Sequence, residues 1–100
     1  MKRGKQDKAL FLTQRELERI GAALAAPRRY QILKEIGASK EPHPCTALLE
    51  SNEITAATLS HHLKELERAN LVEIIRDGKF MKLSIKRPVL QAYLRHLAAI

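Results

Sequence analysis

The stretch that decides the fold is ITAATLSHHLKELERANL, residues 54–71. It predicts one helix with both ends marked, because Thr55 is a favourable N-cap and Asn70 tolerates the left-handed conformation in which chains leave a helix. Between these ends Leu59, Leu63 and Leu66 recur at i, i+4 and i+7 and form a single apolar stripe. The stretch therefore predicts a helix that packs through one side and leaves the other side free.

The side opposite the leucines carries small or polar residues near the start of the helix and cations further along. On that side lie Ala57, Ser60, His61, Lys64 and Arg68. A helix that sets its first half against base edges and its later cations against phosphates has this distribution. We expect His61 to contact DNA. His62 flanks the leucine stripe, so it is predicted to be a partly buried, hydrogen-bonded packing residue.

The composition favours a partner of opposite charge. The chain has 100 residues, a formal net charge of +7 and a pI near 9.9, which indicates one small domain that attracts polyanions. Nucleic acid and an anionic membrane surface are the two candidates. The chain lacks a transmembrane run and an apolar signal core, so we expect a cytoplasmic protein outside the membrane. A single cysteine, Cys45, excludes an intrachain disulfide and every multi-cysteine zinc framework.

The N-terminal half predicts three further helices. Residues 1–12 are predicted to form a flexible basic arm, and residues 13–100 the folded domain. Thr13 to Glu16 fits a capping box, and Leu17, Ile20 and Leu24 follow it as one stripe. A second helix begins at Pro27 and stops at Gly37, with Tyr30, Leu33 and Ile36 facing inward. A short helix opens at Pro44, and a turn over residues 50–53 leads into the main helix, with Asn52 expected to be left-handed. This order predicts a helix-turn-helix.

The pattern changes after Asn70 from helical to alternating. Two such runs flank Asp77-Gly78, which predicts a tight hairpin with these two residues as its loop. In that register the cross-strand pairs are Arg76–Lys79, Ile75–Phe80, Ile74–Met81, Glu73–Lys82 and Val72–Leu83. A last helix follows Lys86-Arg87-Pro88 with a wide apolar face. We expect part of that face to be covered by a second copy of the chain.

The arrangement resembles the ArsR family of bacterial transcriptional repressors over about residues 13–100. The resemblance depends on three segments, namely residues 24–33, residues 55–71 and Arg76-Asp-Gly78. It implies a mainly α fold with a small two-stranded β wing, a winged helix-turn-helix in the order α-α-α-α-β-β-α. It also implies a homodimer, built on the first and last helices, that binds a palindromic operator in double-stranded DNA. The dimer-interface residues expected on this basis are Phe11, Leu17, Leu90, Tyr93, Leu94 and Leu97.

The resemblance also assigns DNA-contacting positions. Carried over by position, the major-groove residues are Ala56, Ala57, Thr58, Ser60 and His61. The residues expected at the phosphate backbone or minor groove are Lys64, Arg68, Arg76, Gly78 and Lys79. The family often has Gln or Ser where Ala56 and Ala57 stand, and alanine offers a thymine methyl no more than an apolar contact. Sequence readout should therefore depend on Thr58, Ser60 and His61.

No cofactor or metal site is expected. Family members that sense soft metals place paired cysteines near the short helix, whereas this chain has only His43 and Cys45 there, and two ligands do not complete a tetrahedral site. The sequence identifies no effector. It contains no nucleophile–base pair, phosphate loop or metal set, so we expect no enzyme. The leading hypothesis is a sequence-specific DNA-binding repressor, and the alternative is a winged-helix module that binds another protein through the Ile75–Phe80 pair and the last helix.

Overall fold

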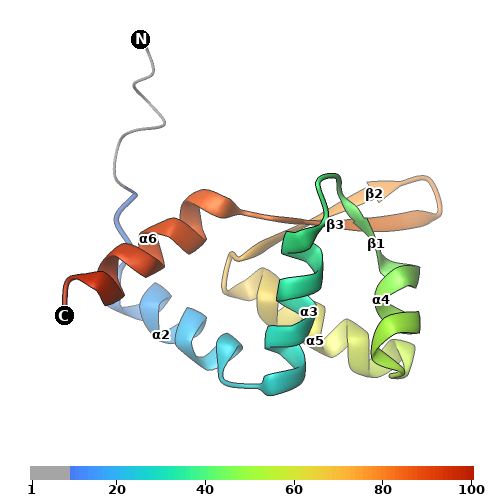
Figure 1. Ribbon diagram of the computed structural model, residues 1–100, viewed down its shortest axis with the longest axis horizontal. Coiled ribbons are helices and arrows are strands. Elements are labelled where there is room, and N and C mark those ends of the chain that lie inside the picture. Colours follow the sequence, from blue (N-terminus) through green and yellow to red (C-terminus); the bar gives the residue numbers. More distant parts are fainter. Residues whose placement is uncertain (1–9) are drawn as a thin grey trace, which may run out of the picture.

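The computed structural model describes residues 10–100 and contains five helices and three strands in that range (Figure 1). Most of the predicted basic arm, residues 1–9, lies outside the described residues. The helices are α2 (Gln14–Leu24), α3 (Pro27–Ala38), α4 (Cys45–Asn52), α5 (Ala56–Arg68) and α6 (Arg87–Ala98). The strands are β1 (His43–Pro44), β2 (Val72–Asp77) and β3 (Phe80–Ile85). The predicted winged helix-turn-helix fold is confirmed.

Helix α5 has the two ends that the sequence predicts. The Thr55 hydroxyl accepts a hydrogen bond from the backbone N–H of Thr58 at 3.1 Å. At the other end Asn70 is left-handed, with φ of 62°. The Asn70 N–H bonds the carbonyl of Glu67, and the Leu71 N–H bonds that of Leu66, which is the Schellman pattern. Leu66 and Leu71 are both fully buried, so this stop is also part of the core.

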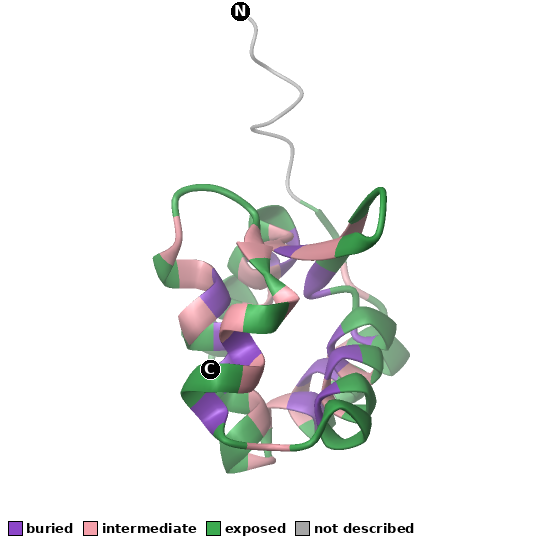
Figure 2. Ribbon diagram, turned by 90° about the vertical axis from the view of Figure 1, so that its right-hand side faces the viewer, coloured by how far each residue is buried: buried purple, intermediate pink, exposed green. Residues whose placement is uncertain are grey.

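The core lies between the inner sides of α2, α3, α4 and α5, the start of α6 and the adjoining part of the sheet (Figure 2). The three leucines of α5 are buried, and so are Ile20 of α2 and Ile32 of α3. Tyr30, which the sequence predicts to face inward, is half exposed. Helix α3 also runs one residue past Gly37, the predicted stop, and ends in an extended Ser39.

The wing is a three-stranded antiparallel sheet in the order β1-β3-β2. Strand β1 was not predicted, and in it His43 pairs with Leu83 and Pro44 with Lys82. This short strand joins the start of α4 to the wing. Helix α4 therefore begins against the sheet instead of emerging from a free loop.

The predicted hairpin register is wrong by two residues. Asp77 pairs with Phe80 and Ile74 with Leu83, so the loop is Gly78-Lys79 instead of Asp77-Gly78. Gly78 has a φ of 62°, as a type II′ turn requires at its first loop position. Arg76 faces Met81 and Glu73 faces Ser84, so neither the predicted Arg76–Lys79 pair nor the predicted Glu73–Lys82 pair forms. Lys82 instead lies 3.6 Å from the carboxylate of Asp77.

The turn between α4 and α5 is left-handed at Glu53, with φ of 53° and ψ of 47°. Asn52, the predicted left-handed residue, is instead the last residue of α4 and is buried, and its amide donates to the carbonyl of Leu48 at 2.9 Å. Glu53 therefore adopts a conformation that is strained for a residue with a Cβ, while the side chain of the neighbouring Asn52 is held by its hydrogen bond to Leu48.

We expect Glu53→Gly to raise the free energy of unfolding by about 0.5–1 kcal/mol, because glycine adopts this conformation without a Cβ clash, while its freedom in the unfolded chain offsets part of the gain. Urea denaturation measures the change. Glu50→Gly is the matched control. Because Glu50 lies within α4, glycine there should lower the free energy of unfolding by about 1 kcal/mol. A loss of stability in both variants would show that the left-handed turn carries no strain.

Candidate nucleic-acid interface

All ten residues predicted to contact DNA are exposed. Seven of them come from the outer side of α5, and the buried leucines of that helix occupy its other side. The other three, Arg76, Gly78 and Lys79, lie at the end of the wing hairpin, where β2 and β3 extend beyond the helices (Figure 1). Helix α5 thus has a free face and the wing a free tip. Contact of these residues with DNA stays a prediction.

The N-terminus of α5 has the charge and the hydrogen-bond donors to bind an anion. Its first turn contains no acidic residue, so the positive end of the helix dipole is not neutralised by its own side chains. Thr55 caps the N–H of Thr58, which leaves the N–H groups of Ala56 and Ala57 without a capping side chain. Exposed backbone N–H groups at a helix N-terminus are donors for phosphate oxygens. The two alanines can therefore act through their backbone, although their side chains cannot read base edges.

The two cations of α5 have different surroundings. Lys64 forms no hydrogen bond or ion pair with any residue in the range 10–100. Arg68 lies 3.0 Å from the Glu65 carboxylate, one turn earlier on the helix. Arg68 also lines a hollow of about 260 Å³ between α2 and α5 together with Arg15 and Arg19. Lys64 is the freer phosphate donor, and Arg68 belongs to a cluster of three arginines.

Arg15 and Arg19 are cations that the sequence analysis did not assign. They are exposed residues of α2, and only the packing of α2 on α5 brings them beside Arg68. Their i, i+4 spacing was visible in the sequence and placed both on one side of α2. Nothing in the sequence said which helix that side would meet.

Two arginines of α3 donate hydrogen bonds to α4 and α5, the two helices of the helix-turn-helix. The Arg28 guanidinium donates to the carbonyl of Asn52 at 3.0 Å, at the C-terminal end of α4. Arg29 donates through Nε to Nδ1 of His62 at 3.3 Å and through a terminal nitrogen to the carbonyl of Ala23. Both arginines therefore connect α3 to other segments of the same chain. His62 is the hydrogen-bonded packing residue that was predicted.

His62 should make the stability of the domain sensitive to mild acid. Burial lowers the pKa of His62 below its usual 6.5, and the charges of Arg29, His61 and Arg28 lower it further. The unfolded chain then binds a proton more readily than the folded chain, so stability should decline as the pH falls below about 6.5. Thermal unfolding at pH 7.5 and 5.5 measures the loss, which His62→Gln should reduce. His96→Gln, at an exposed site on α6, is the control. An unchanged pH dependence in His62→Gln would contradict this assignment.

A second polar network fastens α4 to α3 and β1. Glu35 accepts from the Ser51 hydroxyl at 2.6 Å and from the Asn52 amide at 3.3 Å, and its other oxygen lies 2.9 Å from Nε2 of His43. Burial acts to raise the pKa of Glu35, but the hydrogen bonds from Ser51, His43 and Asn52 outweigh it and lower the pKa below its usual 4.5. The ionised carboxylate therefore joins three elements around the turn.

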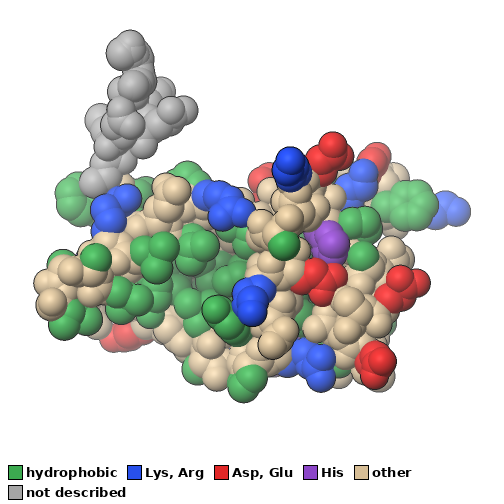
Figure 3. Space-filling view, viewed as in Figure 1, with side chains coloured by type: hydrophobic (Ala, Val, Ile, Leu, Met, Phe, Trp, Pro, Cys, Tyr) green, Lys and Arg blue, Asp and Glu red, His purple; other side chains and the backbone are tan. Residues whose placement is uncertain are grey.

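The predicted dimer-interface residues form an apolar face around α6. Phe11 is 86% exposed, Leu94 53% and Leu97 48%, whereas Leu17, Leu90 and Tyr93 are half-buried. Phe11 lies beside α6, where it lines a hollow with Ala92 and His96. Hydrophobic side chains gather over this flank of the molecule (Figure 3). The face is apolar and open, and dimerisation through it stays a prediction.

Two findings bear on other classes of protein. In residues 10–100, no three side chains of the metal-binding types gather into a site. None of the helices over that range is both long and apolar enough to span a membrane.

Comparison with protein families identifies a helix-turn-helix domain in this chain. A family model described as a helix-turn-helix domain matches residues 24–75, from the last residue of α2 through α3, β1 and the helix-turn-helix into strand β2. A search of curated proteins found no match.

Several solved structures share the fold. An ArsR-like transcriptional regulator from Rhodococcus sp. RHA1 is 25% identical, with a TM-score of 0.75 over 85% of this chain and 78% of that one. The homodimeric winged helix-turn-helix DNA-binding domain of a possible ArsR-family regulator from Mycobacterium bovis is 26% identical, with a TM-score of 0.68 over 85% and 79%. The M. tuberculosis protein Rv0081 is 30% identical, with a TM-score of 0.65 over 86% and 87%.

Proposed function

Since the chain belongs to the ArsR family of winged helix-turn-helix transcriptional regulators, we propose that it is a homodimeric repressor that binds a palindromic operator. DNA binding and transcriptional regulation come with the family. The dimer, the palindrome, the repressor role and the cytoplasmic location are the proposal, as is the absence of catalytic activity. The folded unit is proposed to be residues 13–100.

The free outer face of α5 is the observation that carries this proposal. Its small and polar residues are exposed, its first turn lacks acid, and Lys64 is unpaired among residues 10–100. A helix of 13 residues is about 20 Å long, which is enough to follow the major groove over several base pairs. Thr58, Ser60 and His61 supply the side chains that can hydrogen-bond base edges, and Arg76 and Lys79 of the wing supply cations for the flanking backbone.

The apolar face around α6 supports the dimer. Phe11, Leu94 and Leu97 expose large hydrophobic surfaces, and an exposed apolar patch of this kind marks a protein–protein contact. The similar M. bovis domain is described as homodimeric. A two-fold dimer would present two copies of α5 to half-sites about one helical turn, 34–36 Å, apart. The operator would then be palindromic, because it mirrors the symmetry of the protein.

The test is binding to duplex DNA from the promoter region of its own gene, measured against salt. We expect a palindromic duplex to bind at least about a thousandfold more tightly than random duplex of the same length. Affinity should also fall steeply between about 50 and 200 mM salt, because phosphate contacts release counterions. Equal affinity for all DNA sequences would refute sequence-specific binding. A sedimentation experiment in which the protein binds DNA as a monomer would refute the proposed dimer.

A second candidate function, a protein-binding module, is favoured by one observation. Phe80 is 66% exposed near the tip of the wing, on the same face of the hairpin as Ile75. Lys64→Glu separates the two candidates, since it should lower the affinity for DNA about a hundredfold and leave protein binding through the wing intact. A protein partner that is lost with Phe80→Ala, together with no DNA binding by the unmodified chain, would favour the module.

A further inference from the structure

A furrow with arginines on both walls lies between α2 and α5. It consists of two adjoining hollows, of about 260 Å³ and 220 Å³, which share Arg19, Arg68 and Ala69. Arg15 and Arg19 belong to α2, and Arg68 belongs to the last turn of α5. All three arginines are exposed. We call this feature the α2–α5 furrow.

The acidic side chains along the furrow do not neutralise its arginines. These acids are Glu16, Glu65 and Glu67. The Glu16 carboxylate accepts from the backbone N–H of the N-cap residue of α2, and the Glu65 carboxylate lies 3.0 Å from Arg68. Arg15 and Arg19 form no side-chain hydrogen bond or ion pair with any residue in the range 10–100. Two guanidinium groups of the furrow are therefore available to an anion from outside the domain.

The furrow continues the proposed DNA-contacting face of α5. Arg68 lies on the same side of that helix as Ala57, His61 and Lys64, because successive members of this set are three or four residues apart. At 1.5 Å per residue, Ala57 and Arg68 are about 16 Å apart along the helix axis. A duplex that follows the outer face of α5 to its end therefore reaches Arg68, and the arginines of α2 are on the other wall of the same furrow.

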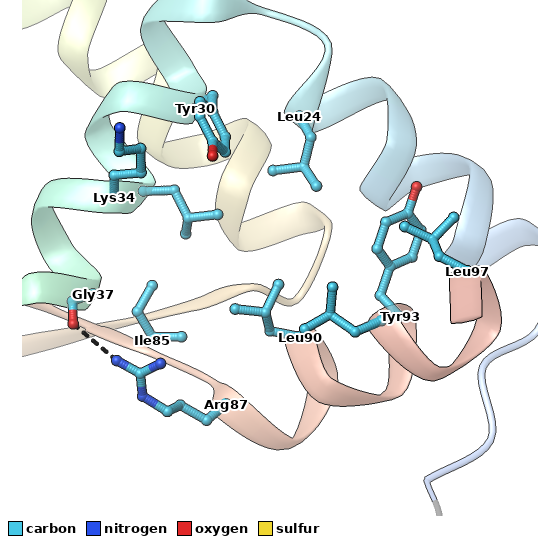
Figure 4. A pocket seen from close by; sticks show the side chains of 11 residues that line it. Leu24, Tyr30, Lys34, Gly37, Ile85, Arg87, Leu90, Tyr93 and Leu97 are labelled. Atoms are coloured by element: carbon cyan, nitrogen blue, oxygen red, sulfur yellow. Dashed lines mark hydrogen bonds between the residues drawn. The ribbon is translucent and has the colours of Figure 1, made fainter.

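The proposed dimer leaves the arginines of α2 accessible. Leu17, the residue of α2 expected in the dimer interface, lies about 160° around the helix from both Arg15 and Arg19. Helix α6 packs on the side of Leu17, since a Cβ at Gly21 would lie 3.4 Å from the Tyr93 hydroxyl. Figure 4 shows Tyr93 reaching from α6 toward α2. Helix α6 and a second copy of the chain thus meet one side of α2, and the arginines lie on the other.

We propose that Arg15 and Arg19 bind phosphates of the operator in the segment between its two half-sites. This inference rests on the proposed function. Helix α2 takes part in the proposed dimer interface, so it lies between α5 and the two-fold axis. Its arginines then face DNA that the two recognition helices do not contact. Contacts to phosphate carry no base information, but they hold the dimer in register on the duplex and fix the spacing of the half-sites.

The first experiment compares Arg15→Gln/Arg19→Gln with the unmodified full chain. Fluorescence anisotropy with the palindromic duplex should show at least about a tenfold loss of affinity at about 100 mM salt. The slope of log affinity against log salt should fall by about 3–4, because a dimer loses four phosphate contacts at about 0.9 each. Arg15→Lys/Arg19→Lys keeps the charges and should keep most of the slope.

The matched control is Lys34→Gln/Lys40→Gln. It removes the same charge from exposed positions on α3 and in the loop that follows it, away from α2 and α5. The control should change the affinity by less than about twofold, since distant exposed charges are screened within about 10 Å at 0.1 M salt. Equal losses in the two double variants would overturn the proposal, because net charge alone would then explain the effect.

The second experiment locates the phosphates by ethylation interference on the palindromic duplex. Ethylation of phosphates between the half-sites should weaken binding of the unmodified chain and not that of Arg15→Gln/Arg19→Gln. Ethylation within the half-sites should weaken binding of both, which also shows that the variant is folded. Interference confined to the half-sites for the unmodified chain would overturn the proposal.

The two hypotheses fail in different ways. Specific binding of the palindrome that the loss of Arg15 and Arg19 leaves unchanged would refute this inference alone. No binding of any duplex by the unmodified chain would refute the proposed function, and this inference with it.

Discussion

Glutamate at Lys64 should lower the affinity for the palindromic duplex about a hundredfold at low salt. Lys64 is exposed on the outer face of α5 and has no partner among residues 10–100, so its charge is available to phosphate. In a dimer each substitution removes two cations and adds two anions at the DNA surface. A hundredfold loss is about 2.7 kcal/mol, or about 1.4 kcal/mol for each subunit. Fluorescence anisotropy with a labelled duplex measures the affinity.

The salt dependence distinguishes a phosphate contact from a general charge effect. Lys64→Gln should reduce the slope of log affinity against log salt by about 1 for each subunit. Lys40→Glu makes the same change of net charge in the exposed loop after α3, and it should alter affinity only slightly. If Lys40→Glu weakened binding as much as Lys64→Glu, long-range charge and not contact through α5 would explain the effect.

Alanine at Leu66 should lower the free energy of unfolding by about 2–5 kcal/mol. Leu66 is fully buried, belongs to the leucine stripe, and lies in the Schellman stop where Leu71 joins it in the core. The total free energy of unfolding of a native domain is about 5–15 kcal/mol, so this loss is a large fraction of its stability. Because the chain contains no tryptophan, circular dichroism during urea denaturation is the suitable measurement.

Leu10→Ala is the control for this substitution. Leu10 is 42% exposed ahead of α2, and the same truncation there should change stability by less than about 0.5 kcal/mol. Both variants must be compared at one protein concentration, because dimerisation would add a concentration-dependent term. A loss below 1 kcal/mol for Leu66→Ala would mean that the leucine stripe does not hold α5 to the domain.

The parts of the fold that sequence predicts well are those fixed by local chemistry. Both ends of α5 follow from Thr55 and Asn70, and the capping box of α2 forms as expected, with Glu16 Oε1 accepting from the Thr13 N–H at 2.7 Å. Each of these contacts joins residues a few positions apart, so the residue types alone determine it. The exposure of the seven predicted DNA-contacting residues on α5 follows from the helical periodicity of its leucines.

The hairpin register could not be fixed in this way. A shift of two residues keeps every side chain on its face, so the alternating pattern fits both registers equally. The choice depends on Gly78, which takes the first loop position, and on the contact of Asp77 with Lys82. Strand β1 was missed because two residues, one of them proline, are too few to show a period.

The turn before α5 shows how tertiary contacts override local preference. Asparagine favours the left-handed conformation more than glutamate does, so Asn52 was the reasonable choice. In the structure its amide is bonded to Leu48 and Glu35, and its carbonyl to Arg28. These partners come from α3 as well as α4, and the sequence alone does not bring them together. The left-handed turn therefore moves to Glu53.

The hydrogen bonds from Arg28 and Arg29 of α3 separate two kinds of position in α4 and α5, those that support the fold and those that can be substituted without disturbing it. Ala57, Ser60 and His61 are exposed, and their side chains form no hydrogen bond with another described residue, whereas Asn52 and His62 support the segment from within. If the outer face of α5 contacts the operator as proposed, substitutions at these outward positions would change which promoter is bound without lowering the stability of the fold. Stability and DNA specificity would then evolve through different residues.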